Sequence, residues 1–580
     1  MRGALGASGC HQFPQKNGRI AKGEIAAWLR MNVKLISKRN MSVKSCSIKR
    51  KGCLRESIGR KSGTRLSILL VLLILVSVTK VAAQSERPNI ILIYADDLGI
   101  GLLGHEGQKI ISTPNIDQLA RDGIRFQRSY ANMLCAPARA SLITGLHDAH
   151  ADPFPISNAG AYVRAEESTL SAIEKSVNEK LPEVSKDQVF MGQVAQGMGY
   201  KTAQFGKLEW GFSTTHQQLV RHGWDYYLGY LDHGRAHGFY PPFLFENGKM
   251  VHYDGNTLLN AGKSIEPETE ASYKERWDKN GKETYSQDIF MQGLLGFIES
   301  NKENPFFIYF PTQLPHGPVS IPEIHPDFAN NDRLSSIEKE YASMVKMLDD
   351  NVGQIVEKLR ELNLEENTLV IFTSDNGHEI YYSKEGRIEK PYTNIQTGER
   401  FDDHTNKYYS ELAGDVFDGN GGQAGMKRSN LEGGIRVPLI IKWPEKIGKG
   451  AVSQRLTANY DLLPTIAEIT GYSKPFESDG LSFYNELVGE GKEDFQHDFV
   501  VYSSFTGPTL ITQDGWKLRT ILSKNVFELF FLPEDLKEEN DLSALHPDKL
   551  AALKTALLEA CDGDYQNGLY STRTSQIKLN

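Results

Sequence analysis

Pro88-Asn89-Ile90-Ile91-Leu92-Ile93-Tyr94-Ala95-Asp96-Asp97-Leu98-Gly99 is the stretch that decides the fold of this 580-residue chain. Residues 88–94 form a continuous apolar run that favours β-structure, which predicts a strand buried on both faces. Strands of this kind are typical of parallel sheets that carry helices on both sides. The run ends in two adjacent carboxylates, and in such sheets ligands collect beyond the carboxyl ends of the strands.

Similar strand patterns recur along the chain, separated by helical ones. Further strands are expected at 201–205, 305–310, 368–373 and 437–441. Helices are expected at 116–122 and 462–469, and apolar residues stepping by three and four from 337 to 362 predict one long amphipathic helix. Strands that alternate with helices predict an α/β fold, a large and mostly parallel sheet sandwiched by helices. The polar, Gly/Asn/Asp-rich residues 381–422 are expected to be a surface insertion near the site.

The pattern changes near residue 494. Short strands are expected at 499–502, 509–512, 516–519 and 527–531, followed by a helix at 547–560. This order predicts a small antiparallel sheet with one covering helix. We therefore expect a leader over 1–83, a main domain over 84–490 and a C-terminal subdomain over 491–580.

Charge is unevenly distributed. Residues 1–65 contain sixteen Lys or Arg and two acidic residues, a balance of +14, whereas the whole chain carries −8. The remaining residues therefore carry −22, which argues against nucleic acid as a partner. Any anion that this acidic body binds must be held by a local cluster of cations.

Residues 66–78 form an almost purely apolar run. Arg60, Lys61 and Arg65 precede it, and Val81-Ala82-Ala83 follows. This is the pattern of a secretory signal peptide, so we expect export to the periplasm or the extracellular space and no stable membrane span after cleavage. An uncleaved anchor is the alternative, although thirteen residues are fewer than the roughly 20 that a spanning helix needs. Of the five cysteines, only Cys135 and Cys561 lie beyond the leader, so no disulfide framework is expected.

Residues 135–145 read Cys-Ala-Pro-Ala-Arg-Ala-Ser-Leu-Ile-Thr-Gly. Pro137 is expected to keep the chain out of a helix around Cys135. Residues 138–143 can then open a helix, whose free N–H groups and dipole would face an anion. Taken alone, Cys135 could equally be a small buried thiol.

Two strand ends carry candidate metal ligands, Asp96-Asp97 and Asp375-Asn376. Two carboxylates that leave a buried strand repel each other unless they are solvated or bridged by a cation. Either pair alone is also typical of ordinary turn chemistry. All these ligands are hard oxygens, so an ion held here should be Ca²⁺ or Mg²⁺ rather than zinc.

Together, the Cys-x-Pro-x-Arg motif and the two acidic strand ends resemble the formylglycine-dependent sulfatases, which have an alkaline-phosphatase-like fold. The resemblance covers most of residues 88–545. It implies that a formylglycine-generating enzyme oxidises Cys135 to 3-oxoalanine (formylglycine), whose hydrate attacks sulfur with one hydroxyl and expels sulfate by deprotonation of the other. The metal ligands that it implies are Asp96, Asp97, Asp375, Asn376 and the modified Cys135.

The resemblance also implies the cations and the acid. Arg139 would be the partner of the formylglycine and the ion, and Lys207 and Lys427 would bind the sulfate. His316 would protonate the leaving alcohol, a task that suits imidazole because its pKa lies near the operating pH. For a lone lysine, a solvated surface position would be the ordinary expectation.

Some positions depart from the pattern of the family. Many relatives read Lys-x-His where this chain reads Lys207-Leu208-Glu209. A carboxylate that faced the sulfate would repel it, so Glu209 is expected to contact Lys207 or the sugar ring. His147, His150 and His237 are candidate active-site or substrate contacts, with packing or surface roles as the alternative.

The sequence thus predicts an exported sulfuric ester hydrolase that acts on a sulfated small molecule or carbohydrate. Two other functions stay open. One is a phosphate or phosphonate ester hydrolase on the same fold. The other is a relative that binds sulfated glycans without hydrolysing them, for which Glu209 is the only support.

Overall fold

The computed structural model describes residues 87–151, 169–180, 185–258, 270–382, 397–398, 405–489 and 495–570. The expected leader and signal peptide, and parts of the expected insertion at 381–422, lie outside these residues. Among the described helices, none combines the length and apolar character needed to cross a membrane.

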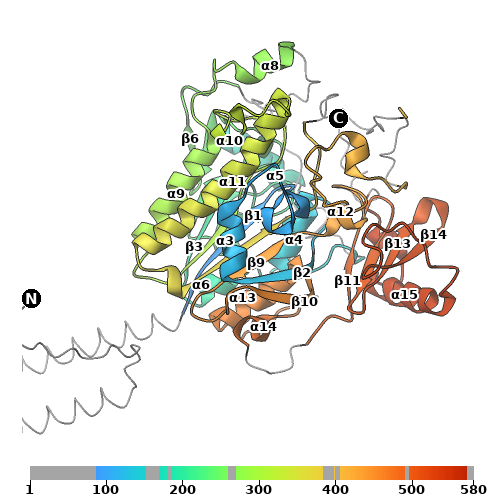
Figure 1. Cartoon of the computed structure of the whole chain (residues 1–580). Coiled ribbons are helices and arrows are strands. Elements are labelled where there is room, and N and C mark those ends of the chain that lie inside the picture. Colours follow the sequence, from blue (N-terminus) through green and yellow to red (C-terminus); the bar gives the residue numbers. More distant parts are fainter. Residues whose placement is uncertain are drawn as a thin grey trace, which may run out of the picture. The chain divides into compact units, whose positions relative to one another are not determined.

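Ten strands form the main sheet (Figure 1) in the order β10-β2-β9-β8-β1-β7-β3-β4-β5-β6. The five strands β8-β1-β7-β3-β4 run parallel to one another at its centre, and β9, β5 and β6 run antiparallel to their neighbours. The mostly parallel sheet is therefore confirmed. The strands are β1 Asn89–Ala95, β2 Ile124–Tyr130, β3 Lys201–Gly206, β4 Tyr226–Gly229, β5 Phe243–Glu246, β6 Lys249–His252, β7 Phe306–Pro311, β8 Thr368–Ser374, β9 Leu439–Lys442 and β10 Ala451–Ala458.

Helices cover both faces of this sheet because its central strands are apolar on both sides. In β1, Ile91 and Ile93 pack in one core, whereas Ile90 and Leu92 pack in the other. The first core is shared with α3 Pro114–Asp122, α9 Ser286–Ser300 and α11 Ser336–Glu361, and the second with α4 Cys135–Thr144, α5 Leu170–Lys180, α6 Met191–Gly197, α13 Leu462–Thr470 and α14 Tyr484–Val488. The remaining helices are α7 His216–Arg221, α8 Glu270–Trp277, α10 Pro326–Ala329 and α12 Glu432–Ile435.

Helix α4 begins at Cys135 itself, so the predicted start at residue 138 is wrong. Pro137 is its third residue. The first N–H groups of a helix have no partner within the helix, so a proline in the first turn loses no hydrogen bond. The extended residue is Leu134, with φ −143° and ψ 149°, and the helix ends at Gly145 in the left-handed conformation, with φ 73°.

The expected C-terminal sheet is present, and Figure 1 shows it in red with its helix. Strands β11 Phe499–Tyr502, β12 Thr509–Thr512, β13 Trp516–Ile521 and β14 Val526–Phe531 pair antiparallel in sequence order. Helix α15 Pro547–Ala560 packs on one face through Leu553 and Leu557. The other face packs against Tyr130, Leu456 and Tyr460 of the main domain.

A buried ion cluster links the two sheets. Nζ of Lys517, on β13, lies 3.0 Å from Oε1 of Glu432 and 2.9 Å from Oε1 of Glu538. All three side chains are buried. Glu432 begins α12 and stands five residues after Lys427, so the small sheet helps to fix the segment that presents this lysine.

Candidate functional site

The paired ends of β1 and β8 bring the predicted metal ligands together. Ala95 is the register partner of Ser374 in this parallel pair, so the residues that follow the two strands are neighbours. The backbone N–H of Asp97 donates to Oδ1 of Asp375 at 3.0 Å, and Nδ2 of Asn376 donates to Oδ1 of Asp97 at 2.8 Å. Together with Asp96, these side chains are fully buried.

Helix α4 adds the cysteine and the arginine at the same place. Nη2 of Arg139 donates to Oδ2 of Asp375 at 2.9 Å and lies 3.6 Å from Oδ1 of Asp96. Cys135 is at the first position of the helix, and one ligand atom from each of Cys135, Asp96 and Asp375 lies within 4.8 Å of the others. The cysteine and the two acidic strand ends therefore form a single site.

Each predicted sulfate-binding lysine has one carboxylate partner and one histidine partner. Nζ of Lys207 lies 2.5 Å from Oδ2 of Asp96 and 3.5 Å from Nε2 of His237. Nζ of Lys427 lies 2.7 Å from Oδ2 of Asp97 and 3.1 Å from Nε2 of His316. The rings of His237 and His316 stack 4.2 Å apart, so the two sets lie side by side.

The oxygens at the strand ends fit a hard divalent cation. Within the described residues, Oδ1 of Asp96 and Oδ1 of Asn376 are buried without a hydrogen-bond partner. A buried oxygen without a donor is costly unless a cation binds it. Three carboxylates here balance the charges of Arg139, Lys207 and Lys427. A sulfate ester would add negative charge, and a divalent ion would compensate it.

The carboxylates differ in their pKa values. Burial favours a higher pKa for both Asp96 and Asp97, but the neighbouring cations, Lys207 for Asp96 and Lys427 for Asp97, outweigh it. The pKa of Asp97 is lowered to about 2, and that of Asp96 is held well below its usual range. Burial and the charge of Asp96 instead raise the pKa of Asp375 well above its usual value. A positive ion beside Asp375 would favour its ionised form.

The sequence analysis missed two side chains of this site, His233 and Tyr381. Nε2 of His233 lies 3.7 Å from Sγ of Cys135, and its ring packs edge-on against His237 at 4.4 Å. The hydroxyl of Tyr381 donates to Oδ2 of Asp97. His233 stands in the same histidine-rich loop as His237, so its position in the sequence could have indicated a site residue. Tyr381 lies outside any motif, and no sequence pattern indicated it.

Glu209 occupies a buried network rather than the expected position beside Lys207. Its Oε1 lies 2.5 Å from Nδ1 of His222 and 3.3 Å from the Thr214 hydroxyl, and its Oε2 accepts a hydrogen bond from Nε1 of Trp224 at 2.7 Å. The side chain is fully buried. These contacts join the segment after β3 to the residues just before β4, so Glu209 stabilises the fold rather than contacting Lys207.

His147 and His150 lie beyond the other end of α4. This helix has ten residues, so its two ends are roughly 15 Å apart along the axis. His147 is buried, and burial lowers its pKa to about 4. Their partners are Asp479 and Asp562, not the residues around Cys135. The structure thus groups His237 with the site but not the other two candidate histidines.

Comparisons with known proteins agree with this geometry. The sulfatase family model matches residues 88–472, and the model of the C-terminal region of N-sulphoglucosamine sulphohydrolase matches residues 424–560. The chain is 27% identical to an N-acetylgalactosamine-6-O-sulfatase of Bacteroides thetaiotaomicron, over 82% of this chain and 93% of the relative. It is 28% identical to the rat N-acetylgalactosamine-6-sulfatase, over 70% and 67%.

Solved structures show the same fold. A Bacteroides thetaiotaomicron structure described as a 6S-sulfatase of glycosaminoglycan metabolism superposes with a TM-score of 0.60 at 23% identity, covering 82% of this chain and all of that one. The structure of BT4656 in complex with its substrate D-glucosamine-2-N,6-O-disulfate superposes with a TM-score of 0.56 at 18% identity, covering 83% and 99%.

Proposed function

The chain belongs to the sulfatase family and is a sulfuric ester hydrolase, and we propose that its substrate is a sulfate monoester of a carbohydrate. The observation that carries the proposal is the cluster of three buried cations and three buried carboxylates around Cys135. With a divalent ion bound, such a site would compensate an anion that the acidic body would otherwise repel. The sugar is supported by the sulfated amino-sugar substrates named for the relatives.

Cys135 is the residue that a formylglycine-generating enzyme would oxidise to formylglycine. Burial raises the pKa of its thiol despite Lys207 and Lys427, so the unmodified side chain stays protonated and is a poor nucleophile. Asp96, Asp97, Asp375 and Asn376 would hold Ca²⁺ or Mg²⁺. When present, the oxidised side chain supplies a hydrated aldehyde as nucleophile, and the ion supplies Lewis-acid stabilisation of the developing charge.

The lysines and histidines of the chain would then divide the remaining work. Lys207 and Lys427 donate to the sulfate oxygens and exchange part of their contact with Asp96 and Asp97 for contact with the substrate. Nδ1 of His316 contacts the carbonyl of Gly317, a contact that assigns the ring proton to this nitrogen. Its Nε2, which faces Lys427, is therefore the atom that would donate the proton to the leaving alcohol, from the imidazolium form of the ring.

We infer that His233 serves the release of sulfate. Its Nε2 lies 3.7 Å from Sγ of Cys135, and burial, reinforced by Lys207, holds its pKa well below the usual value. A neutral imidazole beside the nucleophile can accept the proton whose loss expels sulfate. In many relatives a histidine stands where this chain has Glu209, two residues after Lys207. His233 would perform the task of that histidine here.

The location of the enzyme is part of the same proposal. The basic leader and the apolar run at 66–78 support export to the periplasm or the extracellular space, where sulfated polysaccharides are encountered. The idea of a non-hydrolysing relative rested on Glu209, and the contacts of Glu209 with His222 and Trp224 remove that support.

Leaving-group dependence tests the proposal. We compare a sugar sulfate, an activated aryl sulfate and an aryl phosphate with the parent enzyme and His316→Ala. Loss of the general acid should slow the sugar sulfate by about 10²–10⁴ and the aryl sulfate far less, because a phenolate leaves with little help. His252→Ala, which changes an exposed histidine on β6, is the matched control. Faster turnover of the phosphate than of either sulfate would overturn the proposal in favour of a phosphate ester hydrolase.

A further inference from the structure

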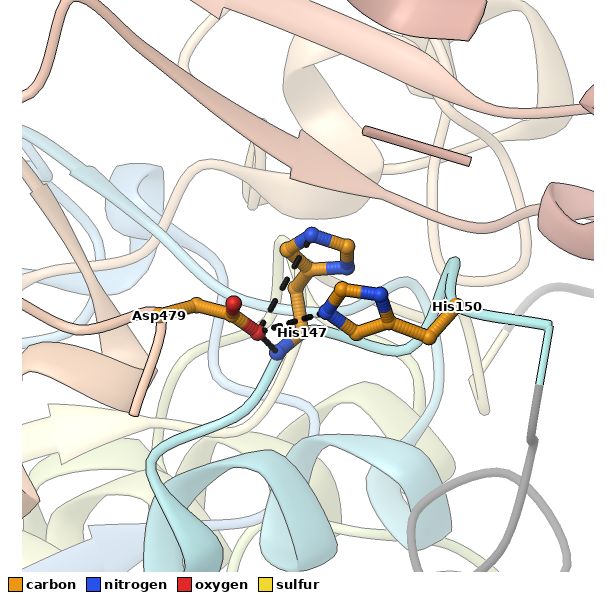
Figure 2. A group of neighbouring side chains, drawn as sticks. All are labelled: His147, His150 and Asp479. Carbon is orange, nitrogen blue, oxygen red and sulfur yellow. Dashed lines mark hydrogen bonds and ion pairs between the residues drawn. The ribbon is translucent and has the colours of Figure 1, made fainter. Parts of the chain in front are cut away.

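A second group of metal-ligating side chains lies at the far end of α4 from Cys135. His147, His150 and Asp479 come from two distant parts of the chain, and one ligand atom from each lies within 4.8 Å of the others. Figure 2 shows the two imidazole rings beside the carboxylate, with their contacts meeting at one oxygen. Oδ2 of Asp479 lies 3.0 Å from Nε2 of His150 and 3.9 Å from Nε2 of His147.

We propose that His147, His150 and Asp479 form a binding site for a divalent transition-metal ion, with Zn²⁺ as the best match. Two imidazoles and one carboxylate suit Zn²⁺ and do not suit Ca²⁺ or Mg²⁺, which prefer oxygen alone. Bonds of about 2.0–2.2 Å at tetrahedral angles place ligand atoms roughly 3.4 Å apart. The distances from Oδ2 of Asp479 to Nε2 of His150, 3.0 Å, and to Nε2 of His147, 3.9 Å, lie below and above that value.

The surrounding contacts orient two of the ligands. Nδ1 of His150 lies 3.2 Å from Oδ2 of Asp562, so this carboxylate can hold the ring proton at Nδ1, and the lone pair of Nε2, which faces Asp479, can bind the ion. A carboxylate on the outer nitrogen of a ligating histidine is the common arrangement in zinc proteins. Asp479 accepts a hydrogen bond from the backbone N–H of His147 at 2.8 Å, and its own N–H donates to the carbonyl of Gly145 at 2.9 Å.

Binding requires one local change. The two rings stack 3.9 Å apart at 10°, and lone pairs in parallel planes do not converge on one ion. Nδ1 of His147 also accepts a weak hydrogen bond from the Ala149 N–H at 3.3 Å. Rotation of the His147 ring would turn its Nε2 toward the ion and release Nδ1 from Ala149, so that Nδ1 can carry the proton. The side chains of His150 and Asp479 are 32% and 26% exposed, which gives an ion and a water ligand access.

Such an ion would have a structural role. It would join the turn after α4 to the segment that carries Asp479, and through Asp562 it would reach the residues that follow α15. The site is separate from the proposed Ca²⁺ or Mg²⁺ site at Asp96 and Asp375, and it does not depend on the proposed reaction.

Zinc binding to the full-length chain tests the proposal without an activity assay. Titration is done in Cys135→Ala, because the thiol could hold Zn²⁺ in the catalytic site, and in excess Ca²⁺ to fill the oxygen ligands there. His147→Ala and His150→Ala are compared with that parent, so that ions bound elsewhere, including at the leader cysteines, cancel. His105→Ala is the matched control, since His105 also contacts carboxylates, at 2.9 Å from Asp117 and 3.6 Å from Glu106, but does not belong to the proposed site.

We expect one Zn²⁺ per chain that is lost in both histidine variants and kept in His105→Ala. Asp562→Asn should weaken binding by about 10–100-fold. Zn²⁺ should raise the Tm of the parent but not that of His147→Ala or His150→Ala, and the metal-free Tm values verify that the variants fold. Bound Co²⁺ should show the strong visible absorption of a four-coordinate site. Equal Zn²⁺ binding in the parent and in both histidine variants, or no bound Zn²⁺ that depends on these residues, would overturn the proposal.

Discussion

Replacement of Glu209 distinguishes a substrate contact from a structural one. The carboxylate makes two short hydrogen bonds in a fully buried setting, 2.5 Å to His222 and 2.7 Å to Trp224. A bond to a charged group contributes about 1.5–3 kcal/mol. Glu209→Gln keeps one acceptor oxygen but turns an amide donor toward the second donor, so it should lose about one such bond. Glu209→Ala loses both and should destabilise the protein by about 3–6 kcal/mol.

Urea unfolding measures this loss as a shift of the midpoint at an unchanged slope. Below the unfolding transition, the KM for a sugar sulfate should stay close to that of the parent in Glu209→Gln, because the side chain contacts His222 and Trp224 rather than Lys207. Glu174→Gln, at a partly exposed position on α5, is a control that should change neither quantity. A raised KM for the sugar together with an unchanged midpoint would refute this reasoning and restore Glu209 as a substrate contact.

Three further predictions concern the ion, the nucleophile and the linkage of the sheets. Chelation should abolish activity and Ca²⁺ or Mg²⁺ should restore it, while Asp375→Ala should lose the ion but stay folded by circular dichroism; full activity after chelation would contradict the ligand assignment. Peptide mass analysis of active enzyme should show the Cys135 peptide lighter by the change from thiol to aldehyde, and Cys135→Ser and Cys135→Ala should both lose turnover; a fully active preparation with only unmodified cysteine would contradict the mechanism. Lys517→Met should destabilise the protein by about 3–5 kcal/mol because it leaves two buried carboxylates unpaired, whereas Lys549→Met, which breaks the exposed pair with Asp514, should cost less than about 1 kcal/mol in urea unfolding.

Much of the fold could be predicted because its central strands have one unambiguous pattern. The expected strand at 368–373 became β8 Thr368–Ser374, and the helix stepping from 337 to 362 became α11 Ser336–Glu361. Strand β2 Ile124–Tyr130 escaped prediction because it contains Arg125, Gln127 and Arg128 and is only partly buried. The start of α4 was predicted three residues late because a proline in the first turn was treated as a barrier.

The site could be predicted where ligands follow strands, since parallel strands bring their carboxyl ends together. This placed Asp96 near Asp375 and Lys207 near both. The role of Glu209 could not be predicted, because its partners His222 and Trp224 are thirteen and fifteen residues away, and only the path of the intervening segment, which contains α7, brings them close. For the same reason, no local pattern separated His237, which reaches Lys207, from His147, which does not.

The buried cluster of Glu432, Lys517 and Glu538 also limits how this protein can recombine with its relatives. A graft that replaced β11–β14 alone would bring a foreign residue to position 517 and keep Glu432 from the host. If the new residue at position 517 were not basic, the buried carboxylates of Glu432 and Glu538 would have lost their shared cation. The segment around Glu432, which follows Lys427, would then have to shift. A crossover that preserves the partnership must lie upstream of this segment, and the C-terminal family model, which begins at residue 424, starts there as well.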